Sequence, residues 1–297
     1  SSGSFGYVTP TLRWWQKIGN RTRLALNANY MRADGNYPFT LVNGKYVTEE
    51  KRNNSDIYSW QGEATLYHTF KDGGEVDVKG YYFNSRRGLP GAVTLWDENA
   101  FVQARYKKHF SSKWSLQAQA KYNYGWNRYE DEGKEYADGY YQAVHRQDEY
   151  YLSATALYRP FKTLSLSLAQ DGAVNTLRSN LKDCPFPTRY ASLTAFNIRY
   201  QYGRITASGS LVHTFITEKV EVGNAPENFR RLAPSASVSI QPWMEKTFFL
   251  RFMYKSTFRT PTFNDLYYYR LGNRSLRPEK ANEYNVGITW SSSSLSF

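Results

Sequence analysis

The chain has 297 residues, and hydrophobic residues make up only 41% of it although aromatic residues alone account for 17%. Aliphatic residues are therefore scarce, and the mean hydropathy of −0.67 argues against a conventional aliphatic core. This composition is typical of a membrane β-barrel, which has a polar lumen and aromatic girdles on its lipid face, and it leaves open a tyrosine-rich soluble β-sandwich that binds glycans.

The formal net charge of the chain is +12. Its basic residues are scattered one or two at a time, with no cluster that would lie along a nucleic-acid duplex, so we predict no nucleic acid as a partner. Anionic lipopolysaccharide or an anionic ligand remains compatible with the charge. Cys184 is the single cysteine, which excludes an intrachain disulfide and a thiolate metal cluster. No apolar run approaches the roughly 18 residues of a membrane-spanning helix.

Apolar and polar residues alternate with a period of two through most of the chain, which predicts strands with one apolar and one polar face. Leu24, Leu26, Ala28 and Tyr30 share the first such face. Similar segments follow at 57–70, 114–128, 164–168, 205–217 and 248–254. Several exceed the roughly 5 to 6 residues typical of globular strands. The pattern indicates an all-β chain of about 13 to 14 strands, the last beginning at 294–297.

The connections between these strands alternate between short and long. Short ones occur at 18–20, 71–74, 111–113 and 202–204, and long polar ones near 34–55, 88–100, 129–139, 171–189, 218–229 and 259–281. This alternation predicts an antiparallel up-and-down meander across a membrane, with tight periplasmic turns on one rim and long extracellular loops on the other. No composition shift divides the chain, so we predict one domain over residues 1–297.

Enzymatic signatures are absent from the sequence: it has no GxSxG, P-loop, HExxH or CxxC motif. His145 and His213 lie on strand-like segments and are interpreted as lumen or packing residues. The acidic segment 130–135 lacks the spacing of a calcium loop, and we interpret it as a solvated loop. We therefore expect no enzyme, no catalytic or metal-ligating residues and no cofactor.

Paired guanidinium groups at Arg86 and Arg87 end a strand beside the turn Pro90-Gly91. Such a pair could hold an anionic ligand bidentately in a receptor mouth, anchor lipopolysaccharide phosphates, or pair with acidic neighbours. A second candidate is the aromatic and arginine-rich stretch from Phe258 to Gly287, which reads as a strand, a long loop and another strand.

The sequence FRTPTFNDLYY at 258–268, followed by LGNRSLRPEKANEYNVG at 271–287, resembles the barrel signature of TonB-dependent outer-membrane receptors. Segments 35–39, 52–54 and 87–91 resemble earlier landmarks of the cobalamin-receptor-like branch, in the same order. The resemblance implies a transmembrane barrel of about 22 strands in the outer membrane. It also implies an N-terminal plug and a periplasmic TonB partner that engages a short box before the plug.

Neither plug nor coupling box is recognisable here, and no secretion signal opens the chain, so we expect a central segment of a longer receptor. The resemblance implies energised uptake of a scarce nutrient, with outer-membrane lipid and lipopolysaccharide, TonB and a small organic or metal-chelate ligand as partners. Haem receptors of the family carry a histidine between the boxes at 258–261 and 273–276, whereas residues 262–270 contain none. This favours a ferric siderophore or cobalamin over haem, and a passive pore is the remaining alternative among membrane functions. The candidate ligand contacts are Arg86, Arg87, Trp96, Arg259, Tyr267, Tyr268, Tyr269 and Arg270.

Overall fold

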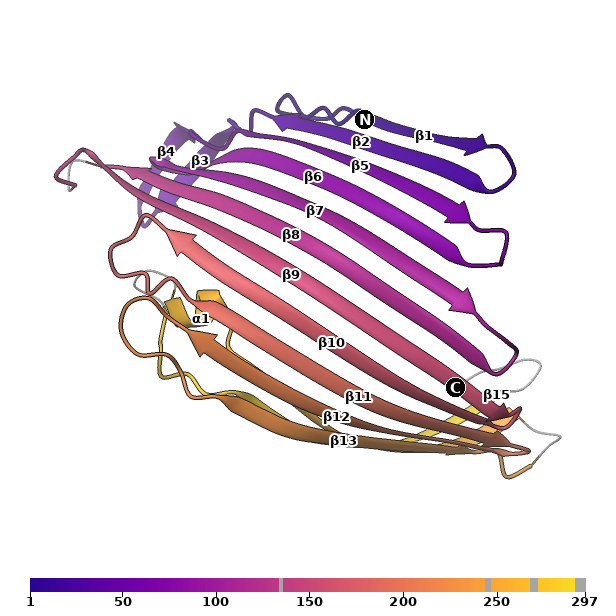
Figure 1. Ribbon diagram of the computed structural model, residues 1–297. Coiled ribbons are helices and arrows are strands. Elements are labelled where there is room, and N and C mark those ends of the chain that lie inside the picture. Colours follow the sequence, from indigo (N-terminus) through magenta and orange to yellow (C-terminus); the bar gives the residue numbers. More distant parts are fainter. Residues whose placement is uncertain (134–135, 244–246, 268–271, 292–297) are drawn as a thin grey trace. The chain divides into compact units, whose positions relative to one another are not determined.

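The computed structural model describes residues 1–133, 136–243, 247–267 and 272–291. Thirteen strands form one antiparallel sheet in which each strand lies beside the next one of the sheet along the chain (Figure 1). They are β1 (Thr11–Ile18), β2 (Thr22–Ala33), β5 (Ile57–Thr69), β6 (Glu75–Leu89), β7 (Val93–His109), β8 (Trp114–Glu132), β9 (Tyr140–Phe161), β10 (Leu164–Ser179), β11 (Thr188–Tyr202), β12 (Ile205–Lys219), β13 (Phe229–Ile240), β14 (Thr247–Arg259) and β15 (Glu279–Ser291).

Two further strands, β3 (Pro38–Asn43) and β4 (Tyr46–Lys51), form a separate hairpin in the connection between β2 and β5. A short helix, α1 (Phe263–Tyr267), lies between β14 and β15. The predicted up-and-down order of about 13 long strands is confirmed, whereas the strand expected at 294–297 lies outside the described residues. Among those residues there is no helix that is long and apolar enough to cross a membrane.

Two compact units are distinguished by their internal contacts. The first comprises Ser1–Arg105, Ala120–Tyr150 and Asn175–Phe186, and the second comprises Tyr106–Gln119, Tyr151–Val174 and Pro187–Phe297. In the first unit, Leu66 of β5 lies opposite Val78 of β6, and both side chains are exposed. The opposite face of the same two strands carries Glu63 and Lys79, whose charged atoms are 2.7 Å apart. One apolar and one charged face is the pattern of a membrane barrel wall.

The second unit repeats this division between β11 and β12. Gly203, with a φ of +54°, allows the tight turn after which Ile205 lies opposite Tyr202. Farther along the pair, Phe196 lies opposite Leu211, and both are exposed on the apolar face. The opposite face carries hydroxyl and amide side chains. A period-two sequence therefore produces one apolar and one polar surface here as well.

Buried apolar side chains are few among the described residues. They are Ala143, Leu177, Cys184, Ala233, Phe263 and Leu266. A soluble β-sandwich buries the inner faces of two sheets against each other and would bury far more apolar side chains. The exposed apolar faces therefore favour a sheet that contacts lipid on one face and water on the other.

The landmark segments at 35–39, 52–54 and 87–91 come together in the first unit. The Asn54 side-chain amide donates hydrogen bonds to the carbonyl oxygens of Leu89 and Val93, at 2.8 and 2.7 Å. A Cβ on Gly88 would lie 2.4 Å from the Asn54 Oδ1 atom, so this position requires glycine. The Arg52 amide donates to the carbonyl of Tyr37 at 2.8 Å. These motifs thus shape the start of β5 and the end of β6.

Candidate functional site

The connection between β14 and β15 folds into α1 through a local capping arrangement. The Thr262 backbone N–H donates to the Asp265 carboxylate at 2.8 Å, and the Asp265 N–H donates to the Thr262 hydroxyl at 3.2 Å. These bonds satisfy donors that the first turn of a helix leaves free. The backbone hydrogen bond from Thr262 is the main reason why the pKa of Asp265 is lowered. Asp265 also accepts a hydrogen bond from Arg259 at 3.2 Å.

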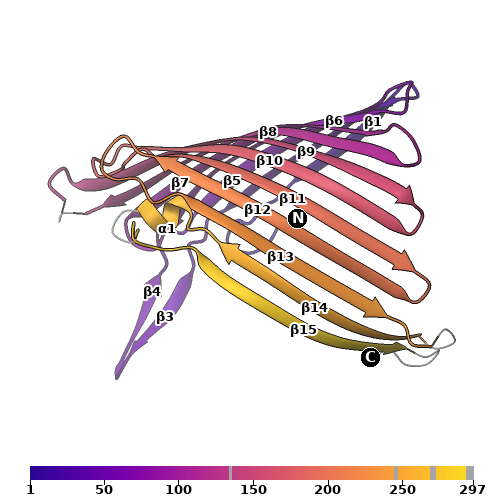
Figure 2. The ribbon, with the colours of Figure 1, turned by 60° about the horizontal axis from the view of Figure 1, so that its bottom comes forward.

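Two apolar side chains of α1, Phe263 and Leu266, are buried, so the helix has a defined packed side. Arg189 at the start of β11 covers the Phe263 ring, with its guanidinium carbon 4.8 Å from the ring centroid. The same guanidinium donates to the Pro261 carbonyl at 2.8 Å. Arg189 therefore holds the segment that leads into α1, through a hydrogen bond to Pro261 and a contact with the Phe263 ring. Figure 2 shows α1 at the end of the unit that is opposite its tight turns.

Glu218 at the end of β12 joins Arg189 to α1. Arg189 donates to its carboxylate at 2.8 Å, and the Tyr267 hydroxyl donates to the other carboxylate oxygen. The Glu218 side chain is only 4% exposed and that of Arg189 15%, so this is a buried ion pair. Burial, followed by the hydrogen bond and charge of Glu218, raises the pKa of Tyr267 well above its usual range. The phenol therefore stays protonated and able to donate.

The predicted ligand contacts in this connection take different roles in the structure. Arg259 ends β14 and is 63% exposed despite its ion pair with Asp265. Tyr267 is half-buried, with its hydroxyl on Glu218 and the Arg274 guanidinium 5.7 Å from its ring centroid. Tyr268, Tyr269 and Arg270 lie outside the described residues. Arg259 thus leaves a charged group open to solvent, whereas Tyr267 anchors α1.

The other predicted contacts lie in the first unit. Arg86 of β6 makes an ion pair with Asp56 at 2.8 Å and lies 5.9 Å from the centroid of Trp96. Arg128 of β8 covers the same indole at 4.2 Å. The Trp96 ring is therefore in contact with two guanidinium groups. Arg87, the next residue on β6, points to the other face, where it is 3.8 Å from Asp97.

Sequence reasoning missed Arg189, Glu218, Arg274 and Arg128. Arg189 at the start of β11 and Glu218 at the end of β12 lie directly opposite each other in the strand register, so their distance in the sequence hides their contact. In the sequence, Arg128 is recognisable only as the last residue of the alternating segment 114–128. The one local signal was the Thr262–Asp265 spacing, which fits a helix cap before a short helix.

Long antiparallel strands with one exposed apolar face, joined in up-and-down order, define a β-barrel wall of the outer-membrane type. Residues 11–297 match the family model described as TonB dependent receptor-like, beta-barrel. The chain therefore belongs to the TonB-dependent receptor β-barrel family, as its motifs indicate. A search of curated protein sequences finds no significant match.

Solved structures show the same fold. The FrpB iron transporter from Neisseria meningitidis is 15% identical with a TM-score of 0.78, over 98% of this chain and 52% of FrpB. The copper transporter OprC is 15% identical with a TM-score of 0.73, over 98% and 50%. The siderophore receptor PiuA from Acinetobacter baumannii is 10% identical with a TM-score of 0.70, over 97% and 53%.

The chain spans about half the length of these solved structures. Members of the family are outer-membrane transport receptors of Gram-negative bacteria rather than enzymes, and the outer membrane is the location of this chain. The soluble glycan-binding alternative is thereby set aside. The family membership leaves the nutrient undefined, because the solved neighbours include a copper transporter, an iron transporter and a siderophore receptor.

Proposed function

We propose that this chain is the barrel portion of a receptor that binds a scarce nutrient with high affinity and imports it with energy supplied through TonB. The family match over residues 11–297 is the observation that carries this proposal. A plug domain and a TonB-binding box would belong to the remainder of the receptor. Outer-membrane lipid and lipopolysaccharide would surround its apolar face.

A metal chelate is the nutrient class that we favour, with a ferric siderophore or cobalamin as the specific candidates. The names of the solved neighbours support metal transport in receptors of this fold, since they include an iron transporter and a siderophore receptor. The proposal of cobalamin is supported only by the landmark segments at 35–39, 52–54 and 87–91. Haem is disfavoured because residues 262–270 contain no histidine that could contact its iron.

The loop ends of the strands supply the groups that an anionic chelate needs. Arg259 offers an exposed guanidinium, and Arg87 lies on the face of β6 that also carries Lys79. Guanidinium groups bind carboxylate, phosphate or catecholate oxygens through paired donors. We retain Arg86, Arg87, Trp96, Arg259, Tyr267, Tyr268, Tyr269 and Arg270 as proposed contacts. The Tyr267 hydroxyl is already used by Glu218, so contact by this residue would involve its ring.

Binding and uptake by the full-length receptor test the proposal. We expect one ferric siderophore or cobalamin to bind more tightly than haem, and cellular uptake to stop when the proton-motive force is dissipated. The variant Arg259→Gln should weaken binding of an anionic chelate about tenfold if one charged hydrogen bond is lost. Uptake that persists without the proton-motive force would instead establish a passive pore, and preferential binding of haem would overturn the substrate class.

A further inference from the structure

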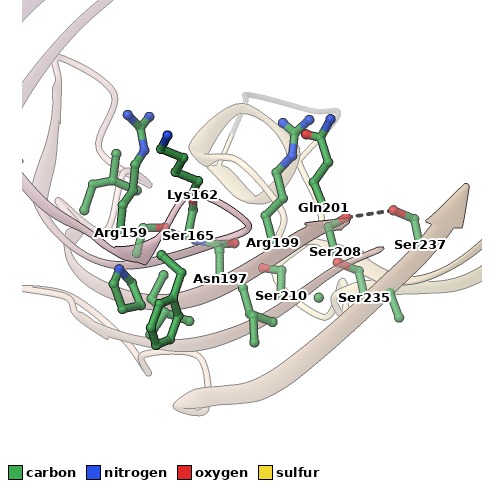
Figure 3. Close-up of a pocket in the computed structure, with 18 of the residues that line it drawn as sticks. Arg159, Lys162, Ser165, Asn197, Arg199, Gln201, Ser208, Ser210, Ser235 and Ser237 are labelled. Carbon is green, nitrogen blue, oxygen red and sulfur yellow. Dashed lines mark hydrogen bonds between the residues drawn. The ribbon is translucent and has the colours of Figure 1, made fainter. Parts of the chain in front are cut away.

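The strands β11, β12 and β13 carry small polar side chains along one face and apolar side chains along the other. Figure 3 shows the polar face, where Ser208 of β12 and Ser237 of β13 lie side by side with their hydroxyls 2.7 Å apart. In the receptor proposed above, the plug and the nutrient would lie on this side of the wall. The opposite face carries exposed apolar side chains such as Phe196 and Leu211, so a polar group on it is exposed to lipid.

Four polar residues interrupt this apolar face. Thr194 lies two residues from Phe196 on the same side of β11, and His213 of β12 lies opposite it in the register. The Gln170 side-chain amide of β10 donates to the Ser192 hydroxyl at 3.0 Å and accepts from the Thr194 hydroxyl at 2.5 Å. Gln170, Ser192, Thr194 and His213 are together called the polar cluster.

His213 is the member of the polar cluster that requires a partner. It is exposed and lies between Thr194 of β11 and Leu232 of β13. Within the described part of the chain, no hydrogen bond or ion pair is seen for its ring. An imidazole ring both donates and accepts hydrogen bonds, and a polar group without a partner is costly in hydrocarbon. A neighbour that brings polar groups to this depth therefore suits the surface better than plain acyl chains do.

The aromatic residues of β11 give the depth of the polar cluster in the membrane. Tyr190 and Tyr200 are both exposed on the lipid face, and Tyr200 follows Tyr190 by ten residues. At roughly 3.3 Å per residue and a tilt of about 40°, this length spans about 25 Å, which is the height of the apolar band of a membrane barrel. Ser192 and Thr194 then lie about 5 and 10 Å inside the boundary at Tyr190. That boundary is the extracellular one, because it lies toward the long connections.

Two cations lie at and beyond this boundary on the same face. Arg230 of β13 lies opposite Phe215, and its guanidinium carbon is 4.8 Å from the centroid of that ring. The Lys219 ammonium at the end of β12 is 5.9 Å from the Tyr190 ring centroid. Both cations are exposed, and neither is seen in an ion pair among the residues that the structure describes. Along the strands, Arg230 is two residues, or roughly 7 Å, from the level of His213.

We propose that this surface is a binding site for one molecule of the lipid A portion of lipopolysaccharide. Lipid A is a phosphorylated disaccharide whose fatty acids are attached through amide and ester bonds and carry hydroxyl groups. Its phosphate pairs with Arg230 and Lys219 through charged hydrogen bonds. An amide or hydroxyl group at the base of the fatty acids bonds to His213 and the rest of the polar cluster. A glycerophospholipid also has a phosphate, but it offers the cluster no hydrogen-bond donor at this depth.

This inference deepens the lipopolysaccharide partnership proposed above, because it assigns a defined site to one molecule instead of a surrounding solvent. It rests on the outer-membrane location and is independent of the nutrient and of energised import. The site lies on the face opposite the one on which the plug would lie, so the full-length receptor leaves it accessible.

Native mass spectrometry of the full-length receptor, released from detergent micelles, tests the site by counting bound lipid. We expect one lipid A to bind per receptor, and phosphatidylglycerol at the same concentration to bind more weakly. The double variant Lys219→Gln/Arg230→Gln should bind lipid A about tenfold more weakly, because two exposed ion pairs are lost. The control Lys45→Gln/Lys51→Gln removes the same charge from the β3–β4 hairpin and should bind as the parent does.

The variant His213→Leu tests the polar cluster separately from the cations. We expect it to weaken lipid A binding about fivefold, as one hydrogen bond is lost, and to leave phosphatidylglycerol binding unchanged. Binding of the nutrient should stay at the parent level in all these variants, so failure of this site is distinguishable from failure of the proposed import. Circular dichroism of each variant confirms that the strands are formed.

Four results would overturn the proposal. Equal binding of phosphatidylglycerol would show a surface that accepts any anionic lipid. Equal weakening in the Lys45→Gln/Lys51→Gln control would show a general effect of net charge. Parent affinity for lipid A in His213→Leu would show that the polar cluster is not part of the site. A lipid-free mass of two receptors that His213→Leu converts to one would assign the surface to a second copy of the chain.

Discussion

Glu218 is the residue on which the arrangement of the β14–β15 connection depends. Its buried carboxylate accepts from Arg189 and Tyr267, so it links β11, β12 and α1 in one network. Removing one partner of a buried ion pair leaves the other charge without compensation, which typically costs about 3–5 kcal/mol. Loss of the Tyr267 hydroxyl alone leaves the ion pair intact and costs about 1–2 kcal/mol.

The variant Glu218→Ala should therefore release α1 from the wall, and Tyr267→Phe should loosen it less. Limited trypsin digestion measures this, because cleavage after Arg274 requires local opening of the connection. We expect the cleavage rate to rise in the order parent, Tyr267→Phe, Glu218→Ala. The variant Glu227→Ala, which changes an exposed carboxylate in the β12–β13 connection, is the control and should cleave at the parent rate. An unchanged rate in Glu218→Ala would show that the network does not hold the loop.

Two glycines of β6, Gly88 and Gly80, differ in the space around them, so the same substitution at both positions tests whether Gly88 is required for steric reasons. A Cβ on Gly88 would meet the Asn54 side chain at 2.4 Å and its backbone oxygen at 2.7 Å, whereas a Cβ on Gly80 would meet nothing within 4 Å. Gly88→Ala should destabilise the receptor by about 1–3 kcal/mol through overpacking. Gly80→Ala should be neutral or slightly stabilising, because it restricts the unfolded chain. The urea midpoint followed by tryptophan fluorescence compares them, and equal midpoints would contradict the steric account.

The elements differ in how far the sequence determines them in advance. Long strands are predictable because period-two alternation persists over segments such as 114–128, and the side-chain period of a strand is two. The helix α1 is too short to show a helical period, and only its cap is readable. The Arg189–Glu218 pair depends on strand register, and the Trp96 site on three neighbouring strands. Such contacts form only in the tertiary structure, so neither the composition nor the spacing of residues along the sequence predicts them.

At the scale of the whole molecule, the strands share a division into a lipid face and a polar face. Leu211 and Ser210 are neighbours on β12 with side chains on opposite faces, and Leu211 is 41% exposed. An arginine on the lipid face of a membrane barrel costs about 2–4 kcal/mol near the bilayer midplane, while a polar lumen accepts the same charge. The two positions therefore test the assignment of faces with the same introduced residue.

We expect Leu211→Arg to lower the unfolding free energy of the full-length receptor in phospholipid vesicles by about 2–4 kcal/mol, and Ser210→Arg to change it by less than about 1 kcal/mol. Urea unfolding in vesicles gives both values, and the same measurement in detergent micelles should reduce the difference because a micelle adapts to the charge. A larger loss in Ser210→Arg than in Leu211→Arg would reverse the two faces. Arg199 and Lys255 share the face of Ser210 through the strand register, so that reversal would place their charges against lipid, where they are costly.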